Sequence, residues 1–223
     1  MKAVFRELTP PFVWKALQRA IVRAQPREKV ELGAERQSDY YDAGYPEIRE
    51  YRRHYADSQY FFLWCVLIDR IRPAEVRCLF DIGCGPGQFG SFLHDRGLRK
   101  YVGLDFSGEC IRMARLACPS CEFVCANAFT SGLFDTLDYD VVVATEFLEH
   151  VEGDLLILDR IRPSTRVYGS VPNFPHPAHV RHFNSREEVY ARYSSAFSDF
   201  RVDEFPFGSG GMSFFLFEGV RVG

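Results

Sequence analysis

A glycine-rich turn that directly follows a short apolar run constrains this 223-residue chain more than any other feature. Residues 79–90 read LFDIGCGPGQFG, so that β-prone residues lead into Asp81 and an amphipathic pattern of Phe89, Phe92 and Leu93 begins after the turn. This order predicts a buried strand, a sharp turn and the start of a helix. Glycines let a ligand approach the backbone closely, and the start of a helix offers free N–H groups.

The spacing of the glycines separates two kinds of cofactor site. The dinucleotide fingerprint G-x-G-x-x-G requires a glycine at position 88, where the chain has Gln. The pattern present is D-x-G-x-G-x-G, formed by Asp81, Gly83, Gly85 and Gly87. A strand-to-helix turn without a ligand also fits this pattern, so the sequence of the next strand is needed to distinguish a cofactor site from such a turn.

That next strand ends in an acid. Residues 100–107 read KYVGLDFS, and Asp105 follows the turn at the roughly 20-residue spacing at which an acid accepts hydrogen bonds from ribose hydroxyls. Together, DIGCGPG and VGLDFS resemble the first two motifs of the class I S-adenosylmethionine (SAM) methyltransferases. The resemblance covers residues 76–173 by motif and implies SAM as the cofactor.

The resemblance also implies a cofactor-binding set. The turn and Asp81 would hold the methionine part of SAM, and Asp105 would hold the ribose. The family typically has an acid where Asn127 stands, and the amide oxygen of Asn can still accept a hydrogen bond from adenine. The expected set is Asp81, Gly83, Gly85, Gly87, Asp105, Phe106, Asn127, Ala128, Glu146 and Tyr60.

Acids and an imidazole follow the fourth predicted strand. Glu146, Glu149 and His150 have the spacing i, i+3, i+4, which predicts one face of a helical turn. The string resembles the E-x-x-E-H metal motif of small-RNA 2′-O-methyltransferases and ubiquinone-pathway O-methyltransferases. With His179 it would hold Mg²⁺ or Mn²⁺ against substrate hydroxyls. Many relatives carry the string without a metal, and there His150 acts as a base or a cap. Both interpretations stay open, with His150, His179 and Glu149 as the expected catalytic residues.

A proline- and histidine-rich loop follows the fifth predicted strand. Residues 174–183 read FPHPAHVRHF. An imidazole titrates near working pH, so His179 or His182 could serve as a general base or complete a metal site. Arg181 could pair with an anionic group of the substrate.

From residue 76 the chain alternates short strand and helix patterns, which predicts parallel βαβ units in a doubly wound sheet. Two further strand-like runs near the C-terminus flank a glycine-rich hairpin signal. The resemblance implies an α/β, Rossmann-like fold with a seven-stranded, mainly parallel sheet and a C-terminal antiparallel hairpin. Strands are expected at 76–82, 100–106, 121–126, 139–145, 165–171, 200–207 and 212–222, and helices at 60–71, 88–96, 107–117, 152–161 and 185–196.

The N-terminal third has a different composition. We expect residues 1–72 to form a helical, tyrosine-rich extension and lid, and residues 73–223 to form the methyltransferase domain. Within the lid, His54, Tyr55, Ser58 and Tyr60 are expected to face SAM and substrate, because tyrosines stack on rings and sugars. Residues 11–24 predict a basic amphipathic helix that packs on its own domain, forms a homodimer contact or touches a membrane surface.

Composition excludes several classes of protein. The net charge of −3 argues against a large nucleic-acid footprint, although residues 1–36 hold eight Lys/Arg against four Glu. No run approaches 18 apolar residues, and the N-terminus lacks a signal-peptide pattern, so we expect a cytoplasmic protein without a transmembrane segment. The seven cysteines fit reduced thiols. Cys118-Pro-Ser-Cys121 with Cys125 lacks a second paired set of ligands, so we interpret it as a helix exit and a strand entry, not as a zinc site.

These features predict an enzyme that uses SAM to methylate a hydroxyl of a small molecule, such as a sugar or glycan precursor in carbohydrate biosynthesis or another biosynthetic intermediate. One alternative is a metal-dependent RNA 2′-O-methyltransferase. An alternative of another class is a catalytically silent SAM-binding partner subunit.

Overall fold

The structure is a computed structural model that describes residues 33–208 and 211–223. These described residues belong to one compact unit. The basic helix expected at residues 11–24 lies outside the described residues, so its role stays a prediction. The boundary expected between residues 72 and 73 also stays a prediction.

In the described residues, seven strands form a single sheet in the order β3-β2-β1-β4-β5-β7-β6. The first five strands pair in parallel, and the last two are antiparallel and form a hairpin. This arrangement confirms the expected fold. The strands are β1 (Leu79–Ile82), β2 (Tyr101–Asp105), β3 (Glu122–Cys125), β4 (Val141–Thr145), β5 (Arg166–Pro172), β6 (Phe197–Phe207) and β7 (Met212–Arg221).

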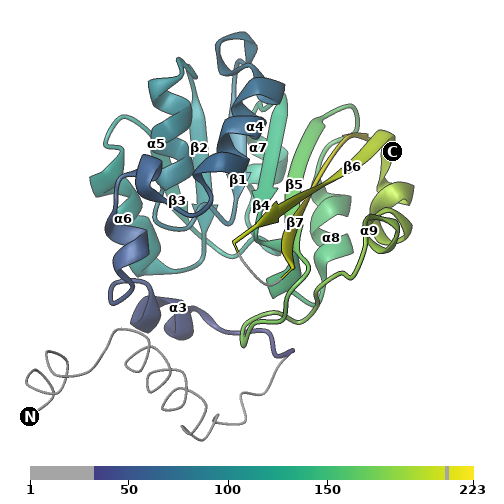
Figure 1. Ribbon diagram of the computed structural model, residues 1–223. Coiled ribbons are helices and arrows are strands. Elements are labelled where there is room, and N and C mark those ends of the chain that lie inside the picture. The colour runs from purple at the N-terminus through teal and green to yellow at the C-terminus, as the bar shows by residue number, and fades with distance from the viewer. Residues whose placement is uncertain (1–32, 209–210) are drawn as a thin grey trace, which may run out of the picture. The chain divides into compact units, whose positions relative to one another are not determined.

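Helices cover both faces of the sheet (Figure 1). One face packs against α4 (Phe61–Ile71), α5 (Gln88–Asp95) and α6 (Gly108–Ala117). The other face packs against α7 (Leu133–Thr136), α8 (Asp154–Arg160) and α9 (Arg186–Tyr193). A further helix, α3 (Ser38–Gly44), precedes them. Short 3₁₀ turns lie at Arg49–Arg52, Tyr55–Asp57, Pro73–Glu75, Leu148–His150 and Ser194–Ala196.

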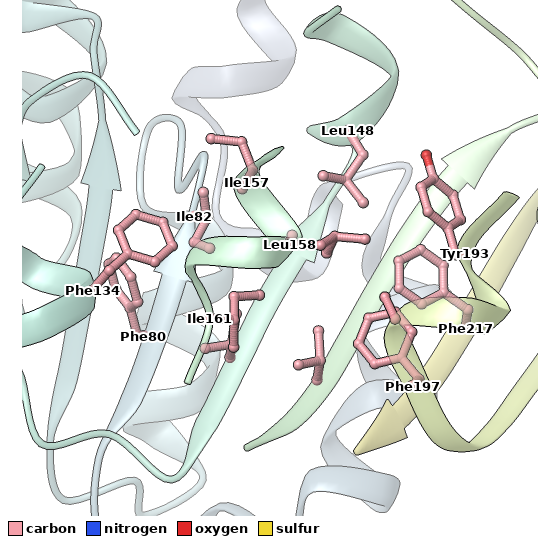
Figure 2. Packing of buried hydrophobic residues seen from close by; sticks show 14 of the residues in the cluster. Phe80, Ile82, Phe134, Leu148, Ile157, Leu158, Ile161, Tyr193, Phe197 and Phe217 are labelled. Carbon is pink, nitrogen blue, oxygen red and sulfur yellow. The ribbon is translucent and has the colours of Figure 1, made fainter. Parts of the chain in front are cut away.

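The sequence pattern explains this layering. Side chains alternate along a strand, so Phe80 and Ile82 face one layer of helices while Leu79 faces the other. Figure 2 shows the first of these cores, in which Phe80 packs edge-to-face against Phe134 of α7. Strands buried on both faces are typical of a parallel sheet between two helical layers.

The ends of the elements follow local chemistry. Helix α4 ends at Ile71, as the following Arg-Pro pair predicts, and Arg72 caps it in a left-handed conformation. Helix α6 begins with the Ser107 hydroxyl accepting a hydrogen bond from the Cys110 N–H at 3.0 Å. None of the described helices has the length and apolar character that crossing a membrane requires.

Candidate functional site

Two cavities lie beside the carboxyl ends of the parallel strands, where ligands bind in open α/β sheets. The first is narrow, about 80 Å³, and the second measures about 680 Å³. The two cavities adjoin and share part of their lining, so a ligand that extends from one into the other would contact the shared residues. The shared residues are Tyr41, Tyr45, Gly83, Gly85, Glu146 and His150.

The structure distributes the expected cofactor-binding residues over these two cavities. The first cavity is lined by Gly83, Gly85, Asp105, Phe106, Asn127, Ala128 and Glu146. Asp81 and Tyr60 line the second. Gly87 lines neither, and a Cβ at this position would lie 2.7 Å from the Ala114 side chain. Gly87, with φ of +78°, thus allows α5 to approach α6 closely.

Asp81 is buried at the end of β1 and is held by one hydroxyl. Tyr101 on β2 donates its O–H to the Asp81 carboxylate at 2.5 Å. Burial raises the pKa of Asp81 from 3.8 to about 7, although the Tyr101 hydrogen bond lowers it in part. A cationic group placed beside this carboxylate would therefore restore its ionised form.

Asp105 at the end of β2 anchors the glycine turn. Its carboxylate accepts hydrogen bonds from the Gly85 N–H at 3.0 Å and the Ser107 N–H at 2.9 Å. Burial raises the pKa of Asp105 to about 6, and these N–H groups oppose the shift. One acid thus joins the turn after β1 to the start of α6.

Asn127 has its own local partner. Its side-chain oxygen accepts a hydrogen bond from the Phe129 N–H at 2.8 Å. An amide oxygen has two lone pairs, so one acceptor site stays available to a ligand. The side chain therefore keeps the acceptor capacity that adenine would require.

Glu146 lies in a strained backbone conformation at the end of β4. Its φ is +50°, a region that few residues other than glycine adopt and that often occurs at functional sites. Ser170 on β5 donates its hydroxyl to the Glu146 carboxylate at 2.8 Å, and Glu146 returns its N–H to the Ser170 carbonyl at 3.2 Å. Burial raises the pKa of Glu146 to about 8.

This conformation corrects the expected helical face. The helical spacing does not extend from Glu146 to Glu149, because the 3₁₀ turn begins only at Leu148. In the described residues, Glu149, His150 and His179 have ligand atoms within 4.8 Å of one another, and Glu146 is not part of this group. The structure therefore brings together three of the four expected metal ligands.

Glu149 is an unusual carboxylate. It is fully buried, and neither of its carboxylate oxygens has a hydrogen-bond partner among the described residues. The His150 Nε2 lies 3.9 Å from Oε1, which is too far for a hydrogen bond. Burial and the charge of Glu146 raise the pKa of Glu149 well above 4.5. An unpartnered buried charge is costly, so this group either carries a proton or lacks a partner that a ligand would supply.

His150 and His179 are oriented by backbone carbonyls. The His150 Nδ1 lies 2.8 Å from the Ala178 carbonyl, and the His179 Nδ1 lies 3.2 Å from the Phe174 carbonyl. A carbonyl accepts only from N–H, so both rings carry their proton on Nδ1 and leave Nε2 as a lone pair. Burial lowers the pKa of His150 to about 4 and that of His179 to about 3, so both are neutral at pH 7.

Aromatic side chains form the outer wall of the second cavity. Tyr45 and Tyr51 stack with ring centroids 4.1 Å apart and nearly parallel planes. Helix α3 is joined to α6 because the Ser107 hydroxyl donates to Asp42 at 2.6 Å. The four residues expected in the lid do not all lie at this cavity. Tyr60 lines the cavity, whereas His54 and Tyr55 line a separate cavity on the outer side of α5.

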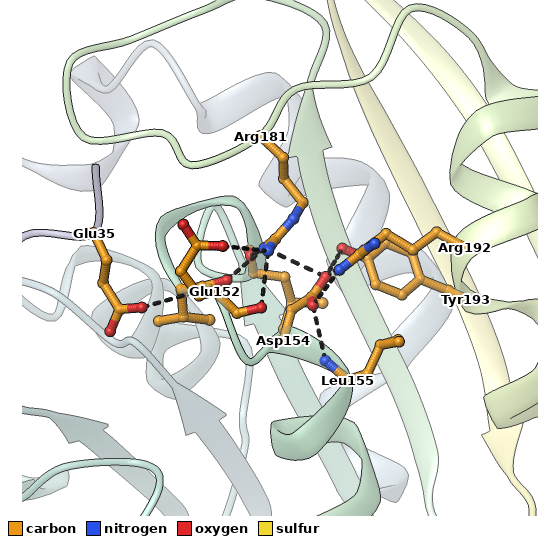
Figure 3. Close-up of polar contacts among 9 residues, drawn as sticks. Glu35, Glu152, Asp154, Leu155, Arg181, Arg192 and Tyr193 are labelled. Carbon is orange, nitrogen blue, oxygen red and sulfur yellow. Dashed lines mark hydrogen bonds and ion pairs between the residues drawn. The ribbon is translucent and has the colours of Figure 1, made fainter. Parts of the chain in front are cut away.

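Arg181 is held inside the protein (Figure 3). Its guanidinium donates to the backbone carbonyls of Leu148, Val151 and Glu152, and lies 3.4 Å from the Asp154 carboxylate. Asp154 is also bonded to Arg192 and Tyr193. Because its Nη1 and Nη2 atoms are engaged by these backbone carbonyls, Arg181 positions the Glu149–His150 turn, which disfavours the expected pairing with a substrate.

Several residues of the site have no clear sequence signal. Tyr101 contacts Asp81 through strand register, and Phe147 lies so close to Gly83 that a Cβ there would be 2.5 Å from its ring. Tyr41 and Tyr45 belong to the tyrosine-rich segment, but their position over the turn depends on where α3 docks. The tyrosine concentration was the available signal, and it did not distinguish the lining tyrosines from Tyr55.

Comparison with known proteins supports the same fold and family. Residues 79–167 match the model of a methyltransferase domain family. A trans-aconitate 2-methyltransferase from Escherichia coli O139:H28 is 37% identical over 62 residues, which are 27% of this chain and 25% of that protein. The chain thus spans about a quarter of the length of the curated relatives that it matches first.

Solved structures share the fold over a larger part of the chain. The PH0226 protein from Pyrococcus horikoshii OT3 has a TM-score of 0.61 and 18% identity, with 82% of this chain and 99% of that chain covered. The 1,6-didemethyltoxoflavin-N1-methyltransferase from Burkholderia thailandensis, solved with bound 1,6-didemethyltoxoflavin and S-adenosylhomocysteine, has a TM-score of 0.59 and 16% identity, with 97% of this chain and 92% of that one covered.

Proposed function

Because this chain belongs to the class I SAM-dependent methyltransferases, we propose that it transfers the methyl group of SAM to a hydroxyl of a small molecule. The methyl carbon would pass from the sulfonium sulfur to the acceptor oxygen, and the hydroxyl proton would pass to a base. SAM supplies an activated methyl group. The protein therefore has to orient the acceptor and remove a proton.

The residues present fit SAM. Asp105 offers carboxylate oxygens for ribose hydroxyls, and Asn127 retains an acceptor for adenine. Asp81 is a buried carboxylate beside the glycine turn, where the cationic part of a methionine group would favour its ionised form. Gly83 and Gly85 have positive φ and leave the turn without side chains. The narrow first cavity would widen if α3, which carries Tyr41 and is followed directly by Tyr45, moved outward.

The observation that carries the proposal is the second cavity, because it shares a wall with the first and presents uncharged Nε2 atoms. Its lining includes five tyrosines, three phenylalanines and a tryptophan, together with the histidines His150, His176 and His179. Its described lining includes no Lys or Arg, which disfavours an anionic acceptor such as an aconitate. Flat apolar walls with hydroxyl tips suit a sugar or a ring that carries a hydroxyl.

The roles proposed for the rim follow from its geometry. His150 and His179 have their Nδ1–H groups on carbonyls, so each Nε2 can accept the proton of the acceptor hydroxyl. Glu149 lies behind these rings and would stabilise an imidazolium once it forms. A cytoplasmic location and a role in carbohydrate biosynthesis remain predictions from sequence.

Calorimetric titration of SAM followed by an acceptor screen tests the proposal. We expect SAM to bind, and Asp105→Ala to weaken binding by about 100-fold because two charge-assisted hydrogen bonds to ribose are lost. Asp135→Ala, at a carboxylate that is 81% exposed, is the matched control. The screen should release S-adenosylhomocysteine with hydroxylated sugars or phenols. Absence of SAM binding would overturn the family-based proposal, and binding without turnover on any acceptor would favour a silent SAM-binding partner.

A second candidate is a reaction assisted by a divalent cation, and the unpartnered carboxylate of Glu149 favours it. Glu149, His150 and His179 would hold Mg²⁺ or Mn²⁺ through a carboxylate oxygen and two Nε2 atoms. Such a cation lowers the pKa of a coordinated hydroxyl, including the 2′-hydroxyl of an RNA end. Neither cavity has the basic lining that an RNA backbone requires in its described residues, so a small acceptor remains the first proposal.

Glu149→Gln distinguishes the two candidates. The substitution keeps the size of the side chain and removes its charge. If a cation is required, binding heat for Mn²⁺ disappears and turnover falls by about 100-fold or more, whereas SAM affinity is retained. Turnover that is insensitive to chelators, with no heat on addition of Mn²⁺ or Mg²⁺, would support a reaction in which a histidine acts as the base without a cation. RNA oligonucleotides with free 2′-hydroxyl ends belong in the same assay.

A further inference from the structure

A second cluster of possible ligands lies outside the site described above, and none of its residues lines either of the two cavities. The side chains of His94, Cys118 and Cys121 place an imidazole nitrogen and two sulfurs within 4.8 Å of one another. The sequence alone argues against zinc, because it shows only the C-x-x-C pair and His94 comes from a different helix. From this juxtaposition we propose that His94, Cys118 and Cys121 form a zinc-binding site that joins α5, α6 and β3.

The backbone of the pair has the turn that a C-x-x-C ligand pair requires. The Cys121 N–H donates to the Cys118 carbonyl at 3.1 Å, so residues 118–121 close a tight turn. Their sulfurs lie 2.8 Å apart, and they would separate to about 3.8 Å on a tetrahedral zinc ion with Zn–S bonds of about 2.3 Å. The chain therefore holds two soft ligands together before any ion binds.

The third ligand completes a set that zinc prefers. His94 lies in the last turn of α5 and reaches the sulfurs of the neighbouring segment. Two thiolates and one imidazole suit Zn²⁺, which binds sulfur and nitrogen, and do not suit Mg²⁺, which prefers oxygen. Two thiolates and a dication also sum to zero charge, so the ion can lie in a partly buried place. Cys118 is buried and Cys121 is half-buried, whereas His94 is exposed.

The ends of two helices add a favourable field. Cys118 is the residue that caps the C-terminus of α6, and His94 is one residue from the end of α5. The C-terminus of a helix carries partial negative charge, which stabilises a cation and disfavours a free thiolate. This placement favours a bound metal over the reactive cysteine of a thiol oxidoreductase, which benefits from a helix N-terminus.

The fourth coordination position has room. A cavity lined by His94, Asp95 and Cys118 opens beside the ligands. The Asp95 carboxylate is already bonded to the Tyr55 hydroxyl at 2.6 Å, so a water molecule would be the simplest fourth ligand. Since the three protein ligands come from two helices and a strand entry, the ion would cross-link parts of the fold on the outer side of the α5–α6 layer.

The test uses the full-length protein, reduced and freed of metal, and titrated with Co²⁺ and then Zn²⁺. We expect one equivalent of Co²⁺ to give thiolate-to-cobalt charge-transfer absorption and the visible bands of tetrahedral cobalt, and Zn²⁺ to displace it. Zn²⁺ should also raise the midpoint of thermal unfolding, because an ion that binds only the folded state stabilises it.

Variants assign the signal to this site. Cys121→Ser should abolish the charge-transfer band. His94→Gln removes a ligand, so it should weaken zinc binding by more than the roughly 100-fold caused by loss of a group that only hydrogen-bonds to a ligand. Cys65→Ser, at an exposed cysteine of α4, is the matched control and should bind like the wild type. Glu149→Gln should also keep the band, because the Glu149–His150–His179 group contains no sulfur.

Three results would overturn the proposal. They are no charge-transfer band in the reduced wild type, a band that persists in Cys121→Ser, and Zn²⁺ affinity that is the same in wild type and His94→Gln. A thiol count two short in the protein as purified, restored by reductant but without subsequent zinc binding, would instead identify Cys118 and Cys121 as a disulfide pair.

Discussion

The two halves of the carboxyl edge of the sheet differ in how their acids are satisfied. At the ends of β1 and β2, Asp81 and Asp105 each accept hydrogen bonds from groups of the protein. After β4, Glu149 is buried without a partner among the described residues, and Glu146 occupies a strained conformation. Partnered acids hold a preformed cradle, whereas an unpartnered acid marks a place where a proton or ligand has to arrive.

The difference matches the two tasks of a methyl transfer. A cofactor common to a family can be bound by a rigid arrangement, which lowers the cost of ordering the site. The transfer itself has to move a proton, and this requires a group whose protonation state can change. The three predictions below test whether the two halves behave independently, from the largest expected effect to the smallest.

Asp81→Asn should change the pH dependence of stability more than any other substitution at the β1–β2 half. The pKa of Asp81 is raised from 3.8 to about 7 in the fold, so its contribution to stability is complete below pH 3.8 and is lost as the pH rises through 7. A shift of this size corresponds to about 4 kcal/mol at 1.4 kcal/mol per unit. Without SAM, the variant should therefore be more stable than the wild type by up to about this amount at pH 8, and by little at pH 4.

Urea unfolding at pH 4, 6 and 8 measures this difference, with Asp138→Asn as the control because its carboxylate is 76% exposed. The same variant should bind SAM more weakly, because the charge is then missing. Parallel pH profiles of the wild type and Asp81→Asn would show that Asp81 is not held in an unfavourable charged state.

Arg181→Met should affect the β4–β5 half. The guanidinium donates to three backbone carbonyls around the Glu149–His150 turn and contacts buried Asp154. We expect a loss of about 3 kcal/mol in unfolding free energy, at the low end for a broken buried ion pair because Arg192 stays bonded to Asp154. If Arg181 positions the turn, kcat should fall while the Kd for SAM stays close to that of the wild type.

Arg186→Met, at an exposed position of α9, is the control for the lost charge. Arg181→Lys keeps the positive charge and most of the side-chain length but loses the planar group that bonds to three carbonyls. It therefore distinguishes the effect of the charge from the effect of these hydrogen bonds. Equal losses in SAM affinity and in kcat for Arg181→Met would contradict the independence of the two halves.

Tyr51→Ala should have the smallest effect of the three. Its ring stacks on Tyr45 at 4.1 Å over the cavity, and such a pair contributes about 1 kcal/mol beyond its buried area. We expect a severalfold rise in KM for the acceptor and a small change in stability. Tyr190→Ala, at a half-exposed ring of α9, is the control in both assays. If KM stays the same as in the wild type for every acceptor found in the screen, Tyr51 does not contribute to binding the acceptor.

Local sequence determined the frame of this protein. The run LFDIGCGPGQFG predicts the strand, turn and helix correctly, because glycine spacing and the periodicity of neighbouring apolar residues act over a few residues. Strand-to-helix alternation predicts the parallel sheet for the same reason, and the acid of VGLDFS falls at the strand tip, where it bonds to the glycine turn. The C-terminal hairpin follows from its own turn residues.

Only the tertiary structure decided which distant side chains meet. The Tyr101–Asp81 bond depends on strand register, and the role of Arg181 depends on how its loop packs against the Glu149–His150 turn. The left-handed conformation of Glu146 separates it from Glu149, although their spacing suggests one helical face. His94 approaches Cys118 and Cys121 because α5 and α6 pack side by side. Such contacts join residues far apart in sequence, and they are determined by the packing of whole elements, which no short motif encodes.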